Sequence, residues 1–323
     1  MPEYCVIPTA ALSATADAIK AKTGSAEDIE FTQDGFADAV AAIPTAPVAR
    51  GTGTNSLIEI HTTSPNIASE ASSVAIGGGN QSIASGAVTI GTNNVASAQN
   101  AVAIGSKLAG ADPNTASAPA ATALGLSCEA SGYGSVAVGY NTTASNTGSF
   151  SAGYQTTSSG QASIATGYTS TASGTASAAI GQEVTASATG SVAVGRSTTA
   201  SAAQAFAAGR NTKAEAAAST ALGYGTDATG ARSLVAGAYN EPDANEIDTT
   251  HGSGARKYLM IIGNGTADDA RSNAATLDWN GNLVLAGGLS ANFGIANAGK
   301  FLVVGADGKL TLVTMAEWQG GSY

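Results

Sequence analysis

The sequence predicts an all-β fold in which twelve coils of 14 residues stack into a parallel β-solenoid. Three observations favour this fold. A short apolar run ending in glycine recurs at a nearly constant interval, the residues of each run alternate between apolar and small, and small residues dominate the composition. Gly accounts for 41 of the 323 residues, whereas charged residues make up 11% and aromatic residues 5%. A chain so poor in large side chains favours thin stacked coils over a thick layered core.

The repeat is defined by the glycine that ends each apolar run. Ten of the eleven intervals between these glycines are 14 residues long, and the interval from Gly105 to Gly125 is 20. The six extra residues, near Pro113, are expected to form a loop that bulges from one coil. The solenoid is predicted to cover residues 73–240. Its reference glycines are Gly77, Gly91, Gly105, Gly125, Gly139, Gly153, Gly167, Gly181, Gly195, Gly209, Gly223 and Gly237.

Each repeat is predicted to contain a strand, a glycine turn, a shorter extended segment and a second turn. The residues one and three positions before the glycine are mostly apolar, as in Val136 and Val138, and the residue between them is small. Glycine is expected where the chain reverses tightly and side chains of successive coils would collide. At about 4.8 Å per coil, twelve coils give a rod of roughly 58 Å.

The columns of Val and Ile have no bulky second layer to cover them, because 14 residues per turn leave a thin interior. The coils are therefore predicted to associate with partner chains around an axis. The residues alone require some partner, and three chains is the usual number, so a homotrimer is expected. The net charge of −10 disfavours binding to nucleic acid or to an anionic membrane. Since no window approaches the roughly 20 apolar residues of a membrane helix, membrane insertion is not expected.

The segments on either side of the solenoid differ from it in pattern. Residues 1–47 are predicted to form short helices at 9–22 and about 34–42, which either attach the chain to a particle or cap the trimer. Residues 48–72 are expected to be a linker with one short strand, and residues 241–323 a cap or tip of β-hairpins with turns at 278–282 and 306–309. The N-terminus lacks a basic region followed by an apolar stretch, so no signal peptide is expected and synthesis in the bacterial cytoplasm is predicted.

Aromatic and basic residues recur directly after the reference glycine. Stacked coils would place these side chains about 4.8 Å apart in one stripe, which suits contact with the sugar rings of a surface glycan. The alternative is that the stripe packs against a neighbouring chain or stabilises the edge of the coils. The arginines either bind an anionic sugar or phosphate or are solvated edge charges. The candidate ligand-binding residues are Tyr140, Tyr154, Tyr168, Tyr224, Arg196 and Arg210.

Metal binding, cofactor binding and catalysis are not expected. His61 and His251 are the two histidines, and neither lies in a dense ligand cluster, although one histidine on a three-fold axis can bind a metal. Asp268 and Asp269 match no known Ca²⁺ loop and are expected to form a polar turn. The sequence has no GxSxG, HExxH or P-loop motif, so the chain is predicted not to be an enzyme.

The two cysteines, Cys5 and Cys128, lie far apart in the sequence and form no CxxC pair. They are expected to be free thiols in a protein that folds in a reducing compartment.

The units SVAIGGGNQSIASG, AVAIGSKLAG, SVAVGYNTTASNTG and SVAVGRSTTASAAQ resemble the head repeats of trimeric autotransporter adhesins. The resemblance covers about residues 73–240. It implies a left-handed parallel β-roll wound in a homotrimer, which commonly serves adhesion to a host surface.

The flanking segments resemble a different group of proteins. The stretch ALSATADAIKAKTGSAEDIEFTQDGFADAVAAI is similar to the start of tail proteins of phages and prophages. The stretches KYLMIIGNGTADDARSNAATLDWNGNLVLAGGL and GKFLVVGADGKLTL are similar to phage tail-fibre and baseplate-associated proteins. Together they predict a homotrimeric tail fibre, or receptor-binding protein, on the tail of a virion or phage-like particle.

Such a fibre would bind a baseplate or tail protein through its N-terminal region and a host surface glycan or protein through the rest. The first alternative is a cell-surface trimeric adhesin of a bacterium. The second is a glycan depolymerase tail spike.

Overall fold

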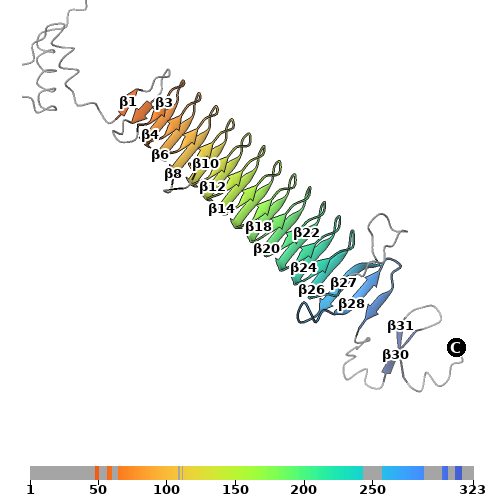
Figure 1. Cartoon of the computed structure of the whole chain (residues 1–323). Helices are drawn as coiled ribbons and strands as arrows, with labels where there is room; N and C mark the ends of the chain where they lie inside the picture. Colours follow the sequence, from red (N-terminus) through yellow and green to blue (C-terminus); the bar gives the residue numbers. More distant parts are fainter. Residues whose placement is uncertain are drawn as a thin grey trace, which may run out of the picture.

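The computed structural model describes residues 48–50, 57–59, 65–107, 110, 112–242, 257–286, 300–304 and 310–314. The predicted N-terminal helices, His61, His251 and Cys5 lie outside these ranges. Within them the chain contains strands and no helix, and the coils stack along one axis into a rod (Figure 1). The predicted all-β parallel solenoid of twelve coils is therefore confirmed.

Each coil contributes one five-residue strand to the first sheet of the rod. Each of these long strands pairs in parallel with its copies in the preceding and following coils, and the register aligns the reference glycines, as in Gly139 with Gly153. The long strands are β4 (Val74–Gly78), β6 (Val88–Thr92), β8 (Val102–Ser106), β10 (Thr122–Leu126), β12 (Val136–Tyr140), β14 (Phe150–Tyr154), β16 (Ile164–Tyr168), β18 (Ala178–Gln182), β20 (Val192–Arg196), β22 (Phe206–Arg210), β24 (Thr220–Tyr224) and β26 (Leu234–Ala238).

A second sheet of twelve two-residue strands runs alongside the first, also with parallel pairing. Its first strand, β3, lies in the segment expected to be a linker and precedes the first long strand. The short strands are β3 (Ile67–Ala68), β5 (Gln81–Ser82), β7 (Val95–Ala96), β9 (Thr115–Ala116), β11 (Glu129–Ala130), β13 (Thr143–Ala144), β15 (Thr157–Ser158), β17 (Thr171–Ala172), β19 (Thr185–Ala186), β21 (Thr199–Ala200), β23 (Lys213–Ala214) and β25 (Asp227–Ala228).

The six-residue insertion lies at the corner between β8 and β9. The long strands on either side of it keep their register, with Gly105 opposite Gly125. Asn114, the last residue before β9, is fully buried at the position that Asn94 occupies one coil earlier. The stacking of the coils on either side of the insertion is therefore unchanged, as the sequence predicts.

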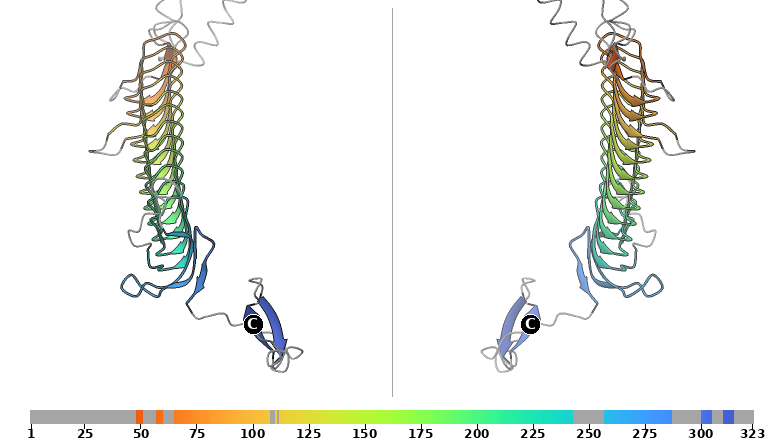
Figure 2. Two further views of the ribbon diagram at one scale, coloured as in Figure 1. Left: turned by 90° about the vertical axis from the view of Figure 1, so that its right-hand side faces the viewer. Right: turned by 90° about the vertical axis from the view of Figure 1, so that its left-hand side faces the viewer.

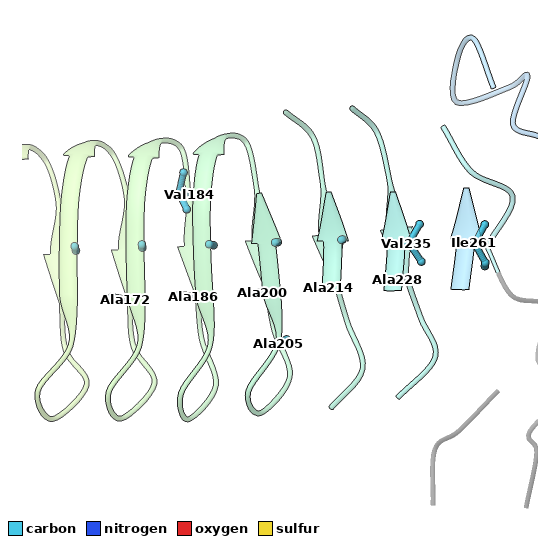
Figure 3. Close-up of a cluster of buried hydrophobic side chains, with 14 residues drawn as sticks. Ala172, Val184, Ala186, Ala200, Ala205, Ala214, Ala228, Val235 and Ile261 are labelled. Atoms are coloured by element: carbon cyan, nitrogen blue, oxygen red, sulfur yellow. The ribbon is translucent and has the colours of Figure 1, made fainter. Parts of the chain in front are cut away.

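Four columns of small side chains fill the interior of the rod. In the coil of Gly195 they are Ser191, Ala193, Thr198 and Ala200, and all four are fully buried. Figure 3 shows the buried hydrophobic side chains over several coils; six of the nine labelled residues are alanines, and the others are Val184, Val235 and Ile261. The core thus consists of small residues on the inward side of both sheets, and each strand's larger residues point outward.

The interior also has a polar column, which satisfies carbonyl groups at the glycine turn. The Asn80 side-chain amide donates hydrogen bonds to the carbonyl oxygens of Ile76 (2.8 Å) and Gly91 (2.7 Å). Its Oδ1 accepts a hydrogen bond from the backbone N–H of Asn94 (3.0 Å) in the next coil. Cys128 takes the same place further along and is a buried free thiol, as predicted.

The reference glycine is required by the backbone itself. Gly139 has a φ of +125°, a backbone conformation that residues with a Cβ rarely adopt. A Cβ at this position would also overlap the carbonyl oxygen of Gly153 in the next coil. All twelve reference glycines have a positive φ. The repeat therefore keeps glycine because two coils approach each other closely at this corner.

Strands that break the repeat close both ends of the rod. At one end β1 (Val48–Arg50) pairs antiparallel with β2 (Leu57–Glu59), which pairs in parallel with β4. At the other end β27 (Tyr258–Asn264) pairs in parallel with β26 and buries Ile261 opposite Val235. The strands β28 (Asn273–Asp278) and β29 (Leu283–Leu285) then continue the sheet in antiparallel order. Figure 2 shows how these strands continue the sheet beyond the last coil.

The predicted turn at 278–282 follows hairpin chemistry, whereas the one at 306–309 lies outside the described residues. Between β28 and β29, the Asp278 carboxylate accepts hydrogen bonds from the side chain and backbone N–H of Asn282, both at 2.8 Å. These bonds hold the pKa of Asp278 below its usual value. A separate antiparallel pair, β30 (Lys300–Val304) with β31 (Leu310–Thr314), follows in the sequence.

Candidate binding surface

The outward side of the long strands carries two apolar columns. The first consists of the residues three positions before each reference glycine, and the second of those one position before it. Their largest members are substantially exposed in the single chain: Phe150 is 38% exposed, Ile164 42% and Phe206 37%. The pattern continues without a break through all twelve coils. We call this surface the apolar face.

The outward side of the short strands is polar. From β13 to β21 the outward residue is threonine in every coil, at Thr143, Thr157, Thr171, Thr185 and Thr199. Threonine suits a half-buried strand position and presents its hydroxyl to water. The remaining strands of this sheet carry charged or polar residues at that position, as at Glu129 and Lys213, except for Ile67 and Val95 near the N-terminal end of the rod. We call this surface the threonine face.

The predicted tyrosine stripe forms at the end of the long strands. The rings of Tyr140 and Tyr154 have centroids 5.0 Å apart and an angle of 12° between planes, and those of Tyr154 and Tyr168 are also 5.0 Å apart, at 6°. The three rings are therefore stacked face to face at the spacing of the coils. Tyr168 is 47% exposed, so the stripe lies at the surface of the chain.

This stacking changes what the stripe can offer to a ligand. A sugar ring packs on the open face of an aromatic ring, but both faces of Tyr154 are occupied by its neighbours. What remains exposed along the stripe is the ring edges and a row of phenol hydroxyl groups. Along the stripe a glycan therefore meets hydroxyl groups and ring edges, and the strand register places Leu126 beside Tyr140 and Gln182 beside Tyr168 at its two ends.

Tyr224 belongs to a separate group of residues near the end of the rod. The guanidinium of Arg210 lies 5.1 Å from the centroid of the Tyr224 ring, and Tyr239 meets that ring edge-on at 4.8 Å. A hydrogen bond with Tyr224 raises the pKa of Tyr239 above its usual value. Arg196 pairs with Arg210 in the strand register and is exposed.

The predicted site residues therefore form two groups, the three stacked tyrosines and the Arg196–Arg210–Tyr224 segment. Gln182 stands between them in the strand register. Sequence reasoning missed Tyr239, because it lies two positions after its reference glycine and turns back with a φ of +38°.

The other polar clusters of the chain are parts of turns and corners. Asp268 forms an ion pair with Arg271 (2.6 Å), and Arg271 also donates to the carbonyl oxygens of Gly225 and Asn240. This pairing ties the cap to the last coil and agrees with the predicted polar turn.

A shallow hollow beside the insertion is lined in part by Asp112 and Glu129. The described residues contain no group of three or more His, Cys, Asp or Glu side chains placed to hold a metal ion. They also contain no helix with the length and apolar character needed to cross a bilayer.

The repeat matches a known family in four segments. A model of the YadA head domain repeat matches residues 78–107, 130–156, 158–183 and 186–212, all within the solenoid. The shaft is similar to a YadA head. Its adhesin-like character, predicted from the repeat units, is therefore confirmed for this part of the chain. No curated protein matches the chain.

Proposed function

We propose that the chain is a homotrimeric, non-catalytic fibre that mediates adhesion to a bacterial surface, carried on the tail of a phage or phage-derived particle. The observation that carries this proposal is the apolar face. A row of partly exposed Val, Ile, Phe and Leu side chains runs along the whole rod, and a continuous apolar surface of this kind marks a site of protein association. Three copies that turn this face toward a common axis remove it from water.

The YadA-head-like repeat supports both the number of chains and the adhesive role, since head repeats of this kind belong to trimeric adhesins. The thin interior supports it as well. Because columns of alanine and serine bury little apolar area, a single coil gains little stability from its own core. Burial of the apolar face between chains supplies the missing part.

The particle-borne setting is supported by the flanking segments. Residues 11–43, 257–289 and 299–312 resemble phage tail and tail-fibre proteins, whereas the shaft resembles a bacterial adhesin. In this proposal the N-terminal segment binds a baseplate or tail protein, and the shaft and C-terminal strands meet the host. The alternative from the shaft alone is an adhesin anchored on a bacterial cell. Detection of the protein on purified particles supports the fibre, and detection on intact cells without particles supports the adhesin.

The trimer is tested by light scattering of the purified chain. A mass of about three times the 31.3 kDa chain is expected, and a mass of one chain refutes the proposal.

Adhesion is tested by binding of the labelled protein to whole host cells, and the stripe by the triple variant Tyr140→Ser, Tyr154→Ser and Tyr168→Ser. We expect the variant to lose binding and to keep its trimeric mass. A triple change at Thr143, Thr157 and Thr171 to Ser, in the same three coils, is the matched control. Binding by the tyrosine variant at the wild-type level rules the stripe out as the contact.

A further inference from the structure

The apolar face has a regularity that the association of chains does not by itself require. In every coil the two columns compensate each other in size. The four large residues of the first column each stand beside a small residue of the second column: Phe150 with Ala152, Ile164 with Thr166, Phe206 with Ala208, and Leu234 with Ala236.

The opposite order occurs as well. The three small residues of the first column each stand beside a large residue of the second column: Thr122 with Leu124, Ala178 with Ile180, and Thr220 with Leu222. The remaining five coils carry Val in the first column with either Ile or Val in the second. No coil carries two alanines, and no coil carries two of the largest residues. We call the position of one coil along the rod a level. The combined size of the two outward side chains is thus similar at each level, although each column alone varies from Ala to Phe or Ile.

Such compensation has a physical reason only if both columns fill one shared, closed layer. Side chains two residues apart on a strand that faces water do not limit each other's size, since solvent fills whatever space they leave. In a packed layer, by contrast, a residue that is too large forces strain and one that is too small leaves a cavity. The pairing of Phe with Ala is the solution that keeps such a layer full.

We propose that the order of side-chain sizes along the apolar face, which we call the size code, holds copies of this chain parallel and at the same height along the rod. The partner is a second copy of the chain, and the side chains of the two copies are matched in size separately at each level. At each level the first-column residue of one copy packs beside the second-column residue of its neighbour. The inference rests on the proposed trimer and adds to it the register and the residues that select it.

Arrangements in which one copy is shifted along the rod relative to its neighbour lose this compensation in side-chain size. A shift of one coil in one direction sets Phe206 beside Leu222, which overfills that level. The same shift in the other direction sets Ala178 beside Thr166, which leaves that level underfilled. An antiparallel pair matches levels of unrelated size. Because the backbone hydrogen bonds of both sheets are satisfied within each chain, the side chains alone have to select the register.

The test moves one phenylalanine within a level or between levels. The same-level variant is Phe150→Ala with Ala152→Phe, which reverses the order as the chain itself does at Ala178 and Ile180. The level-mismatched control is Phe150→Ala with Ala208→Phe. The two variants have identical composition and alter the same face. Mass is measured by light scattering and stability by thermal melting.

We expect both variants to remain trimeric and the same-level variant to melt within about 2 °C of the wild type. The mismatched variant should melt roughly 3–6 °C lower, because one level is underfilled and another is overfilled. Equal melting temperatures of the two variants, in a protein that is still trimeric, overturn the size code and leave the proposed function standing. A monomeric wild type overturns the proposed trimer and the code with it.

A second pair of variants keeps the test decisive if the first pair does not fold. It places the exchange at the other phenylalanine level, with Phe206→Ala and Ala208→Phe at the same level, and Phe206→Ala with Ala152→Phe as the mismatched control. The same order of melting temperatures is expected. The reverse order contradicts the code.

Discussion

The apolar face and the threonine face are the outward sides of two sheets built from the same coils. Both have parallel strands in register, and both cover the same interior columns of small residues. They differ in strand length, with five residues in one and two in the other, and in the side chains that point away from that interior. In the coil of Gly167, Ile164 on the apolar face is 42% exposed, whereas Thr171 on the other face is half-buried. In a thin solenoid the interior side chains therefore determine the fold of the coils, and the outward side chains determine which partner the chain binds.

The largest expected effect tests this division with one charge on each face. Ile164→Asp places a carboxylate in the proposed chain interface, where a charge without a partner is costly, and should destabilise assembly by at least about 3 kcal/mol. Light scattering should show loss of the trimer. Thr171→Asp lies in the same coil on the threonine face and should leave the mass unchanged. Loss of the trimer in both variants would mean that the two faces are equivalent.

The second prediction concerns the two corners that join the faces. Gly167→Ala should lower the free energy of unfolding by about 3 kcal/mol or more, because φ is +113° and the new methyl group meets the carbonyl oxygen of Gly181. Gly148→Ala, at the corner after the short strand, should cost much less, since a Cβ there comes no closer than 4.0 Å to another coil and Ala162 and Ala176 adopt a similar positive φ at the equivalent position in the next two coils. Thermal or denaturant unfolding measures both. A similar cost at the two corners would contradict the special role of the reference glycine.

The third prediction concerns the tyrosine stripe at the edge of the apolar face. Tyr154→Ser removes two stacked contacts, each of which contributes about 0.5–1.5 kcal/mol beyond simple burial, so a loss of roughly 1–3 kcal/mol is expected. Thr157→Ser, in the same coil on the threonine face, is the control and should change stability by about 0.5 kcal/mol or less. If the two variants unfold alike, the stack does not stabilise the rod.

The smallest expected effect is a gain in stability at one turn. Thr169 holds a β-branched side chain at a φ of +48°, and its hydroxyl is buried without a hydrogen-bond partner. Asn141 and Asn211 occupy the equivalent turn with the same backbone, so Thr169→Asn should stabilise the chain by about 0.5–1 kcal/mol. The melting temperature should rise slightly. A lower melting temperature would show that the packing of the Thr169 methyl group stabilises the chain by more than the backbone strain at this residue costs.

Much of the fold was predictable because the same alternation of residues and the same glycine position recur in every coil. The alternation before each glycine predicts which residues share a side of the strand, and the constant interval predicts how the coils stack. The insertion between Gly105 and Gly125 was recognisable for the same reason, since it interrupts the interval once and the register resumes after it. Tyr140, Tyr154 and Tyr168 were expected in one stripe, and they lie in one.

Other features depend on how side chains meet in space. Whether stacked tyrosines expose faces or edges is decided by the orientation of each ring, which equal spacing in the sequence does not specify. The contact of Arg210 with Tyr224, and of Tyr239 with the same ring, joins residues from three coils. Likewise, Arg271 reaches two carbonyl groups of earlier coils only because β27 continues the first sheet before the chain turns back.

By itself, then, the sequence determined the number of coils, their register and the residues that line each column, because a period of 14 with glycine at one corner allows only this stacking. The tertiary structure decided which columns are inside. It buries the small residues of both sheets and leaves the Val, Ile and Phe columns on the surface, since coils stacked about 4.8 Å apart leave no interior space for large side chains. The apolar columns, for which the sequence offers no covering layer, are thus the outer surface of one chain.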